Sequence, residues 1–562
     1  MFEDRKLNSF FSPDKLELVR THPFFKKSIE SLRKTAEELL ATDPPRLKYS
    51  EMHIYYTEGT REPYDSKYWA YENRLVCFFN MYMLFGGEEY LEAITDMLYD
   101  ICNMEMWSSA HGIEESRSLK DRRTMLDLRS TGMGRSVAMV LYYLGDKLPE
   151  LVYRRAKSEL RERIIDAYAT SYNHWWMRTT LNWAAVCTGN IMMTYIYMAE
   201  KNEIAEQLPR MLHSLELYIS GFDDEGCCPE GYGYWNYGMV HYCPAAILLR
   251  DYTEGKIDLF RNSKVHNIAL FQQNAAMNDR EDVPFSDTTK KFSPIPWLSH
   301  FLKSEYEDVE IPSLKAPDNF STQQLYTLTL LNPEYEGSVM KGKSFYYGGA
   351  QWFIHRADSY SFVCKAGYNN EPHNHNDVGS FAISKNGSIT LDDPGRARYD
   401  KDYWDYGDKR YSQYVCCSSR GHSVPIIDGC YQVTGKEKSR VLIATENEFS
   451  FDMEQAYSYE ALKRLNRHII CKPEGVSLTD SFQFSGKPEV LTERFVTLIE
   501  PKITPDGVQV GDSIIRYDSS QVEAPTVSFE DFFVDAGTRR VYQIDFKVKN
   551  ITESLSCSFL FE

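Results

Sequence analysis

The sequence has little of what marks a secreted, membrane-bound or nucleic-acid-binding protein. It contains no run of about 18 apolar residues, so it predicts no membrane-spanning helix. Residues 1–20 lack the charged-then-apolar pattern of a secretory signal, and the 12 cysteines form no CxxC pair. The formal net charge, 63 − 81 = −18, argues against general binding to nucleic acid or to acidic membranes. We therefore expect reduced thiols, a cytoplasmic location, and neither a nucleic-acid nor a membrane partner.

The overall amino-acid composition is typical of a large folded protein. Hydrophobic residues make up 43% of the 562 residues and charged residues 26%, which excludes disordered and collagen-like classes. Aromatic residues reach 14%, as in proteins that line grooves with rings. A chain of this length predicts two or three folded units.

Two kinds of hydrophobic pattern divide the chain. From residue 13 to about 305, apolar residues recur at i, i+3, i+4 and i+7, with short Gly, Asp or Pro breaks between segments. This pattern predicts some ten or eleven helices in antiparallel hairpins, arranged as a bundle or an incomplete α/α toroid. From about residue 341, apolar and polar residues alternate between turn signals, which predicts an antiparallel β-rich domain, most simply a sandwich. We expect helices over 1–305, an irregular connection over 306–340 and the β-domain over 341–562.

The most distinctive segment is EPHNHNDVGSF at 371–381, directly before a strand-like stretch. If this segment is extended, His373 and His375 point to the same face, because side chains repeat every two residues. Two neighbouring imidazoles are costly to bury unless a metal, a carboxylate or a substrate uses their nitrogens. His375, Asp393 and His422 would make three ligands of the kind that zinc accepts. Hydrogen-bonded structural histidines are the alternative.

Two segments of the helical region also carry candidate residues. Asn182 follows the aromatic sequence NHWWMRTT and is placed to begin a helix that runs to Ala199. The loop PEGYGYWNYG at 229–238 opens another helix and contains Tyr232 and Tyr234. The alternatives are that Asn182 only caps its helix and that the loop only packs aromatic rings into a core.

Together these pieces resemble a known family. The patterns E-x-H-N-H-N-D-x-G-S-F, D-P-G-x-x-x-Y, S-S-x-x-H, N-W-A-A-V-C and E-G-x-x-Y-W are similar to the heparinase II/III superfamily of polysaccharide lyases, which includes oligoalginate lyases. The similarity extends from about Ser66 to the C-terminal sheet and is strongest in the histidine block. The resemblance implies a multidomain α+β protein, an incomplete α/α toroid followed by a C-terminal antiparallel β-sandwich. It also implies β-elimination on a uronic-acid-containing glycan.

The implied chemistry explains the residue types. The C5 proton of a uronate is weakly acidic, so an enzyme must neutralise the adjacent carboxylate, remove the proton and protonate the departing oxygen. By the resemblance, Asn182 and His373 bind the carboxylate as negative charge develops. Tyr234 is the acid, with Tyr232 as the alternative.

The resemblance leaves more candidates for the base than for the other roles. The resemblance allows either a second tyrosine or the histidine, and tyrosines crowd the stretch 399–411. We favour Tyr406, then Tyr399. A tyrosine with its ordinary pKa near 10 needs cations or strong donors close by to act as a base. The arginines that flank this stretch, which are otherwise surface charges, are Arg396, Arg398, Arg410 and Arg420.

The resemblance implies a structural zinc. The sequence shows no nucleotide-binding loop and no cysteine-nucleophile motif, so we expect no organic cofactor. His375, Asp393 and His422 are the implied ligands, with Asp392 as a substitute for Asp393 and with His373 left free for substrate. The zinc would brace the loop behind the catalytic histidine. Further substrate contacts are expected from four residues: Trp183, Tyr232, Tyr399 and Arg420.

The expected partner is an anionic oligo- or polysaccharide. Arg129, Arg178 and the arginines of 396–420 could bind sulfate, which favours glycosaminoglycans such as heparan, chondroitin or hyaluronan and their oligosaccharides. An oligoalginate or other uronan lyase is the closest alternative. A glycan-binding protein without catalysis is another, and so is an inverting glycosidase that uses Glu230 and Asp127, which would leave the paired histidines without a role. A homo-oligomer stays an open alternative.

Overall fold

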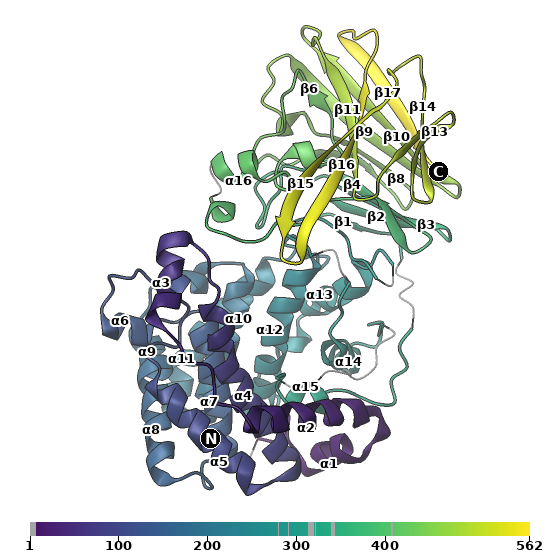
Figure 1. Ribbon diagram of the computed structural model, residues 1–562. Coiled ribbons are helices and arrows are strands. Elements are labelled where there is room, and N and C mark those ends of the chain that lie inside the picture. Colours follow the sequence, from purple (N-terminus) through teal and green to yellow (C-terminus); the bar gives the residue numbers. More distant parts are fainter. Residues whose placement is uncertain are drawn as a thin grey trace. The chain divides into compact units, whose positions relative to one another are not determined.

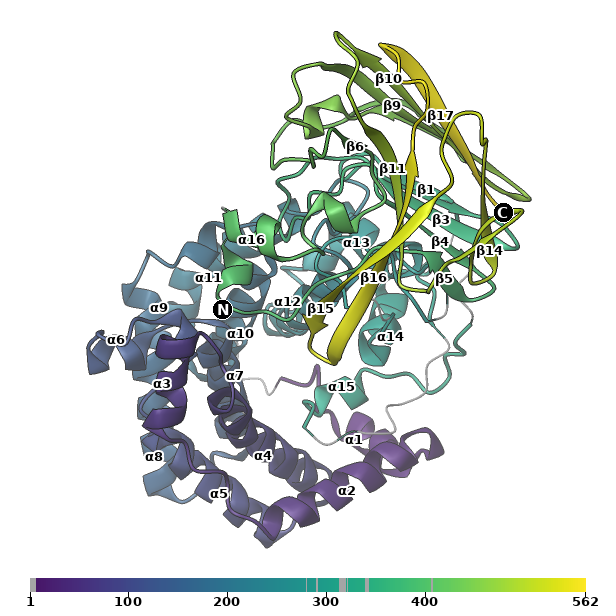
Figure 2. The ribbon, with the colours of Figure 1, turned by 45° about the horizontal axis from the view of Figure 1, so that its top comes forward.

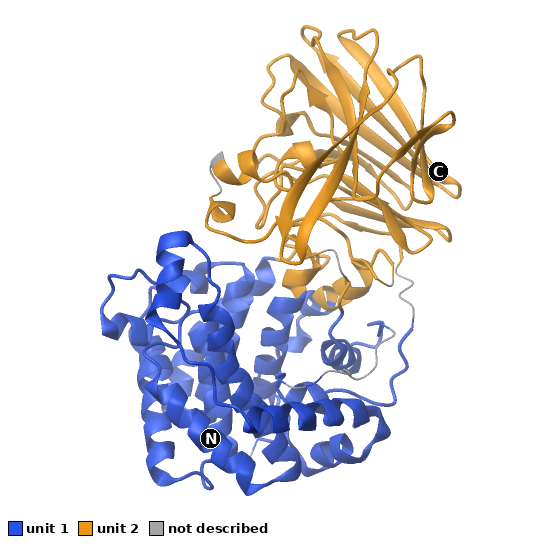
Figure 3. Cartoon of the chain, in the orientation of Figure 1, with its two compact units in different colours: residues 1–221, 236–266, 294–338 blue, residues 222–235, 267–293, 339–562 orange. Residues whose placement is uncertain are grey.

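The computed structural model describes residues 7–278, 280–289, 292–312, 320, 322–338, 343–405 and 408–562. The chain folds into two compact units whose segments alternate along the sequence (Figure 3). Unit 1 comprises Met1–Gly221, Asn236–His266 and Pro294–Ser338, and unit 2 comprises Phe222–Trp235, Asn267–Ser293 and Val339–Glu562. Unit 2 therefore includes two segments that the sequence analysis placed in the helical domain.

Unit 1 is built of helices that curve round in an incomplete ring (Figures 1 and 2). Neighbouring helices pack in pairs, among them α4 with α5, α7 with α10 and α10 with α11. Two helices, α12 and α13, begin in one unit and end in the other. The helices over this part of the chain are α1 Pro13–Thr21, α2 Lys26–Leu40, α3 Tyr49–Glu58, α4 Tyr64–Phe85, α5 Glu88–Asn103, α6 Leu119–Thr124, α7 Leu128–Leu144, α8 Glu150–Leu160, α9 Ala167–Thr170, α10 Asn182–Met198, α11 Lys201–Ser220, α12 Tyr232–Tyr252, α13 Ser263–Asn274, α14 Pro296–Glu305 and α15 Tyr326–Thr329.

The composition of each helix agrees with its depth in unit 1. Nearly every residue of α7 and α10 is buried, so these helices lie in the interior and need no polar face. By contrast, α2 and α5 bury only one apolar face. Asp127 caps α7 through a reciprocal capping box with Ser130. Within the described residues, no helix is both long and apolar enough to cross a bilayer.

The described residues of unit 2 form three antiparallel sheets. The five-stranded sheet has the order β1-β2-β3-β4-β5, the eight-stranded sheet β12-β13-β14-β17-β10-β9-β8-β7, and the four-stranded sheet β15-β16-β11-β6. The strands are β1 Phe345–Tyr347, β2 Trp352–Arg356, β3 Tyr360–Lys365, β4 Phe381–Lys385, β5 Ser388–Leu391, β6 Ile426–Ile427, β7 Arg440–Ala444, β8 Glu448–Asp452, β9 Leu462–Lys472, β10 Gly475–Phe484, β11 Leu491–Thr497, β12 Lys502–Thr504, β13 Gly507–Val510, β14 Ser513–Tyr517, β15 Thr526–Val534, β16 Gly537–Lys547 and β17 Ser554–Phe561.

One apolar core holds these sheets together. It takes Phe362 and Phe381 from the five-stranded sheet, Phe495 from the four-stranded sheet, and Ile469 and Phe559 from the eight-stranded sheet. Buried and solvated residues alternate along β9 and β10, as expected for strands with one face on a core. The predicted fold class, a helical toroid followed by an antiparallel β-sandwich, is confirmed.

Candidate active site

A fully buried carboxylate, Asp287, lies at the centre of the candidate site in unit 2. The Nδ1 atom of His373 lies 2.7 Å from its Oδ2 atom, and the Nε2 atom of His375 lies 3.0 Å from its Oδ1 atom. Both histidines of the distinctive block are therefore partnered by one acid, which is one of the three uses predicted for their nitrogens.

Three more side chains donate to the same carboxylate. The hydroxyl groups of Tyr399 and Tyr403 donate to Oδ2 and Oδ1 respectively, the first over 3.2 Å. The Nη2 atom of Arg410 lies 3.1 Å from Oδ1 and 3.4 Å from Oδ2, and this side chain is fully buried. Asp287 thus joins segments that lie up to 123 residues apart in the sequence.

The histidine block is a loop between β3 and β4, not the extended segment that the sequence analysis assumed. His373 has a φ angle of +57°, in the left-handed region, so alternation of side chains does not apply. Gly379, near the end of the loop, has a φ angle of +96°, and a Cβ atom there would lie 2.6 Å from the Met453 sulfur. The two imidazoles converge because the loop folds around Asp287.

Tyr234 is brought to the same place by the start of α12. Its hydroxyl lies 2.7 Å from that of Tyr399, and its ring stacks on the His373 ring with centroids 4.0 Å apart and an interplanar angle of 28°. Trp404 packs edge-on against the His373 ring and at a tilt against the Tyr399 ring. An imidazole and two phenols, the groups predicted for proton transfer, are therefore in direct contact.

In this cluster the pKa of Asp287 is lowered, whereas the pKa values of two tyrosines are raised. Burial alone would raise the pKa of Asp287, but the Arg410 guanidinium and the two imidazole hydrogen bonds outweigh burial and hold this pKa well below its usual range. Burial, followed by the charge of Asp287, raises the pKa of both Tyr234 and Tyr399. Arg396, stacked 4.3 Å from the Tyr399 ring centroid, offsets only part of this rise. Both phenols therefore keep their protons.

A second carboxylate flanks the other side of the imidazole. The Oε2 atom of Glu230 lies 3.3 Å from the Nε2 atom of His373. Both residues are largely buried, at 6% and 9% exposure. The His373 ring therefore lies between two carboxylates.

The predicted metal ligands are only partly brought together. The Nδ1 atom of His422 lies 2.8 Å from the Oδ2 atom of Asp393, as predicted for a shared ion. His375 instead directs its Nε2 atom at Asp287. Among the described residues, the group that could hold a metal consists of Asp377, Asp393 and His422, with donor atoms within 4.8 Å of one another.

The donor set of this group fits a metal ion. All three residues are fully buried, and the Oδ2 atom of Asp377 has no hydrogen-bond partner. The Nε2 atom of His422 lies 2.9 Å from the Cys416 carbonyl, an arrangement that leaves Nδ1 available to bind a cation. The Lys365 ammonium, 2.8 Å from the Oδ1 atom of Asp377, already neutralises part of the charge.

The remaining residues of unit 2 that the sequence analysis proposed for the site differ in what they contact. Tyr232 is buried, with its ring stacked 5.5 Å from Trp235, so its side chain belongs to the core. Arg420 pairs with Glu530 at 3.1 Å, which does not suit it to hold an anion. Tyr406 lies outside the described residues.

In unit 1, Asn182 is the first residue of α10 and is buried, with Leu181 at the cap position. The structure thus places it where the helix was predicted to begin, but its side chain is not the cap. Trp183 follows it and packs against the exposed Trp175, with ring centroids 4.9 Å apart. This pair, with Trp175 exposed and Trp183 partly buried, offers an apolar surface on which a sugar ring could stack.

Four of the six arginines expected to bind sulfate are paired with acids. Arg129 donates to Asp65, Arg396 to Asp535, Arg410 to Asp287 and Arg420 to Glu530. Arg178 is exposed and donates to the Tyr172 carbonyl over 3.2 Å. The arginine content therefore favours a sulfated substrate over a plain uronan less than the sequence suggested.

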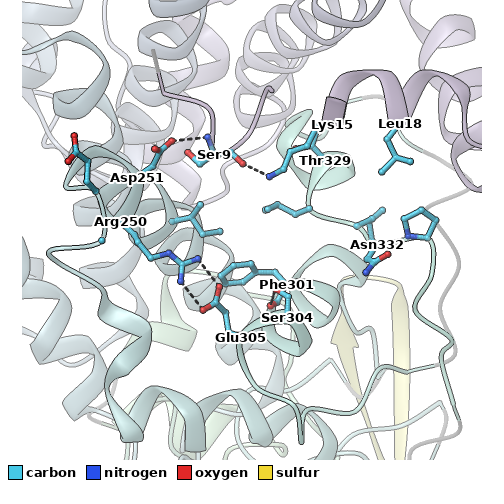
Figure 4. Close-up of a pocket in the computed structure, with 16 residues that line it drawn as sticks. Ser9, Lys15, Leu18, Arg250, Asp251, Phe301, Ser304, Glu305, Thr329 and Asn332 are labelled. Atoms are coloured by element: carbon cyan, nitrogen blue, oxygen red, sulfur yellow. Dashed lines mark hydrogen bonds and ion pairs between the residues drawn. The ribbon is translucent and has the colours of Figure 1, made fainter. Parts of the chain in front are cut away.

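Unit 1 also contains a cavity of about 670 Å³ beside α1, α12 and α14 (Figure 4). Four of its five charged lining residues make hydrogen bonds to their neighbours. Arg250 makes two hydrogen bonds to Glu305, at 2.8 and 2.7 Å, and Asp251 accepts the Ser9 backbone N–H at 2.8 Å. Lys15 donates to the Ser9 carbonyl over 2.5 Å. None of the residues predicted for catalysis or metal binding lines this cavity.

The sequence analysis missed Asp287 and did not single out Tyr403 or Arg410 from their neighbours. Asp287 lies in the stretch PFSDTT, which resembles an ordinary polar connection. No local pattern distinguishes it. Arg410 and Tyr403 were visible only as members of a crowded stretch.

Comparison with known proteins identifies the fold of this chain. No family model matches the sequence, and no curated protein matches it either. A solved heparinase III matches with a TM-score of 0.63 at 12% identity, over 100% of this chain and 93% of its own. The heparinase III fold is therefore the fold of this chain.

Two further lyases share the heparinase III fold with this chain. A heparan sulfate lyase from Pedobacter heparinus has a TM-score of 0.62 at 12% identity and covers 98% of this chain and 92% of its own. A chondroitin AC lyase from Streptomyces coelicolor A3, in complex with chondroitin sulphate, has a TM-score of 0.55 at 10% identity and covers 97% and 80%. At such identities the likeness establishes architecture, and activity has to be argued from the site.

Proposed function

We propose that this protein is a polysaccharide lyase that cleaves uronic-acid-containing glycans by β-elimination. The observation that carries the proposal is the contact of Tyr234, His373 and Tyr399 around one buried carboxylate. The shared heparinase III fold supports it, because the similar structures are described as lyases of heparan sulfate and chondroitin.

The described geometry favours His373 as the base. Its Nδ1 atom lies 2.7 Å from an Asp287 oxygen, whereas Nε2 lies farther, 3.3 Å, from a Glu230 oxygen. In the neutral ring the single hydrogen therefore belongs on Nδ1, the nitrogen with the closer acceptor, and Nε2 is the nitrogen that can take a proton. Glu230 and Asp287 on either side would stabilise the imidazolium that forms. Tyr399 suits this role less, because its pKa is raised by burial and by Asp287. Tyr406 stays an alternative base.

Tyr234 suits the role of acid. Its raised pKa keeps the phenol protonated until negative charge develops on the departing oxygen. In the proposed step, the C5 proton moves to Nε2 of His373, the bond from C4 to the leaving oxygen breaks, and the Tyr234 proton passes to that oxygen. The product is a 4,5-unsaturated uronate. For Asn182, in unit 1, hydrogen-bonding to the uronate carboxylate stays a prediction from the sequence.

Ultraviolet absorbance tests the proposal. Purified protein is incubated separately with oligosaccharides of heparan, chondroitin, hyaluronan and alginate, because the paired arginines leave sulfated and plain uronans both open. Elimination creates a carbon–carbon double bond conjugated to the carboxylate, so a rise in absorbance with one substrate is expected. New reducing ends without such absorbance would establish hydrolysis instead, and binding without either signal would establish a glycan-binding protein.

The two histidines of the loop should differ on replacement. His375→Ala removes a hydrogen bond from a fully buried carboxylate, so we expect a loss of about 2 kcal/mol in unfolding free energy together with lower activity. His373→Ala also removes a hydrogen bond from Asp287, so it should lose similar stability, but because it removes the proposed base we expect a fall in kcat of at least about 10²-fold, larger than in His375→Ala. Denaturant unfolding and initial rates measure the two effects. A fall in kcat in His375→Ala as large as that in His373→Ala would contradict this division.

We propose that Asp377, Asp393 and His422 hold a structural zinc ion. When bound, it would brace the loop that carries His373 and supply no reacting group. Elemental analysis should then find about one zinc per chain in the native protein, and chelation should lower the melting temperature. His422→Ala should lose the metal, whereas His468→Ala, which alters a half-exposed pair with Glu448, should retain it. A native protein that binds no zinc and melts unchanged with chelator would contradict the site.

A further inference from the structure

We propose that Asp287 is the positioning residue of this site: it fixes which nitrogen of His373 faces the substrate and, through Tyr399, holds the Tyr234 hydroxyl. The inference rests on the proposed lyase activity and adds to it a residue that never touches the glycan. It is carried by the way in which the donors divide between the two oxygens of one carboxylate.

The Oδ1 atom of Asp287 is held by structural donors. His375 Nε2, the Tyr403 hydroxyl and Arg410 Nη2 all reach this oxygen. All three side chains are buried, and Arg410 also donates to the backbone carbonyls of Asn374 and Tyr403. These contacts fix the carboxylate plane within the loops of unit 2.

The Oδ2 atom faces the groups that would react. It lies 2.7 Å from His373 Nδ1 and 3.2 Å from the Tyr399 hydroxyl. With Nδ1–H committed to Oδ2, the lone pair of the neutral ring lies on Nε2. A buried acid that orients a histidine base in this way also stabilises the imidazolium formed on proton transfer, as in serine hydrolases.

Oδ2 also holds a second chain of contacts, the second arm, which runs from this oxygen through the Tyr399 hydroxyl to the Tyr234 hydroxyl. A hydroxyl group has one hydrogen, so Tyr399, which donates to Oδ2, accepts from Tyr234 over the 2.7 Å between their oxygens. The Tyr234 hydroxyl is thereby held beside the His373 ring on which it stacks. One buried charge therefore orients both the proposed base and the proposed acid.

Asp287→Asn tests this division because an amide has one accepting atom. Three donors, including Arg410, face the Oδ1 side, so the amide oxygen should take that side and the NH₂ group should face His373 and Tyr399. Nδ1 would then accept, and Nε2 would carry the hydrogen and be unable to act as a base. We expect kcat to fall at least about 10²-fold, with KM within about threefold of the native value.

The matched control is Asp480→Asn. Asp480 is also fully buried and paired with a buried arginine, Arg467, at 2.6 Å, but it lies in the sheet core on β10. It should lose stability and keep its kcat. A kcat in Asp287→Asn within threefold of the Asp480→Asn value would overturn the proposal.

A spectroscopic measurement separates positioning from general damage. In ¹⁵N-histidine-labelled full-length protein, with the His373 signal assigned by its loss in His373→Ala, the neutral ring should carry its hydrogen on Nδ1. This hydrogen should move to Nε2 in Asp287→Asn and stay on Nδ1 in Asp480→Asn. If Asp287→Asn does not fold, the native spectrum still decides, because a neutral ring with its hydrogen on Nε2 would overturn the proposal.

The second arm has its own variant. Tyr399→Phe removes the bridge to Tyr234 and leaves His373 on Asp287, so we expect a smaller fall in kcat, about tenfold, and an unchanged His373 spectrum. Added to Asp287→Asn, it should lower kcat little further, because both changes break the same arm. Fully additive losses would overturn the shared role.

The same experiments separate failure of the positioning role from failure of the lyase proposal. The tautomer readout needs no turnover. Suppose that the native protein produces no unsaturated uronate, but the His373 hydrogen lies on Nδ1 and moves to Nε2 in Asp287→Asn. The lyase assignment then fails, and the positioning role of Asp287 is upheld. If the native protein is an active lyase and Asp287→Asn keeps both its kcat and its spectrum, the positioning role fails alone.

Discussion

Replacing Tyr234 with phenylalanine should lower kcat by about 10²–10⁴-fold, the range that a positioned proton donor contributes. The change removes one oxygen atom, and the ring can keep its stacking on His373 at 4.0 Å. Stability should change little, since the Tyr234 hydroxyl contacts another hydroxyl and fixes no buried charge directly. Initial rates of absorbance increase, measured over a range of substrate concentrations, separate kcat from KM.

Tyr232→Phe is the control for this prediction. Tyr232 lies two residues earlier, in the same motif, but its ring is 2% exposed and packs on Trp235 and Phe292. Its kcat should stay within about threefold of the native value, since an altered core hydroxyl leaves the reacting groups in place. A large loss in Tyr232→Phe with an active Tyr234→Phe would reverse the assignment and restore the alternative acid.

Replacing Arg410 with methionine should cost about 3–5 kcal/mol in unfolding free energy. The guanidinium is fully buried, neutralises Asp287 and donates to the Asn374 and Tyr403 carbonyls. Methionine fills part of the volume but leaves a buried carboxylate without its cation and two carbonyls without donors. Denaturant unfolding of the full chain, monitored through a spectroscopic signal from unit 2, measures the loss in unfolding free energy.

Arg420→Met is the matched control, because the sequence presents both arginines in the same stretch. Arg420 is partly exposed and pairs with Glu530, whose side chain is 39% exposed, so the pair should contribute about 0–1 kcal/mol. If Arg420 binds substrate, as the sequence analysis expected, its variant should raise KM while stability stays near native. A cost for Arg410→Met within 1 kcal/mol of that for Arg420→Met would contradict the role of Arg410 as the partner of a buried acid.

The buried arginine also shows why some expectations from the sequence need revision. Arginine content favoured a sulfated substrate only while each guanidinium was taken as free. In the structure Arg129, Arg396 and Arg410 are committed to carboxylates. Whether an arginine is a ligand for anions or a counterion depends on which acid folds against it, and sequence spacing does not contain that information.

The sequence by itself determined the architecture and indicated most of the residues that we propose to react. Apolar spacing of 3.6 and 2 residues is a local property, so it predicted the helices of unit 1 and the strands of unit 2. The histidine block and the E-G-x-x-Y-W loop were likewise recognisable as short motifs that carry His373 and Tyr234.

Only the tertiary structure decided how these groups work together. Asp287 lies 86 residues from His373, 112 from Tyr399 and 123 from Arg410. It became the centre of the site because two segments of unit 2, one with His373 and His375 and one with Tyr399, Tyr403 and Arg410, close around it. A buried charge is stable only when several donors reach it. The same closure placed Asp377 with Asp393 and His422, and turned His375 toward Asp287. Contacts over such separations depend on the path of the whole chain, and no local pattern encodes them.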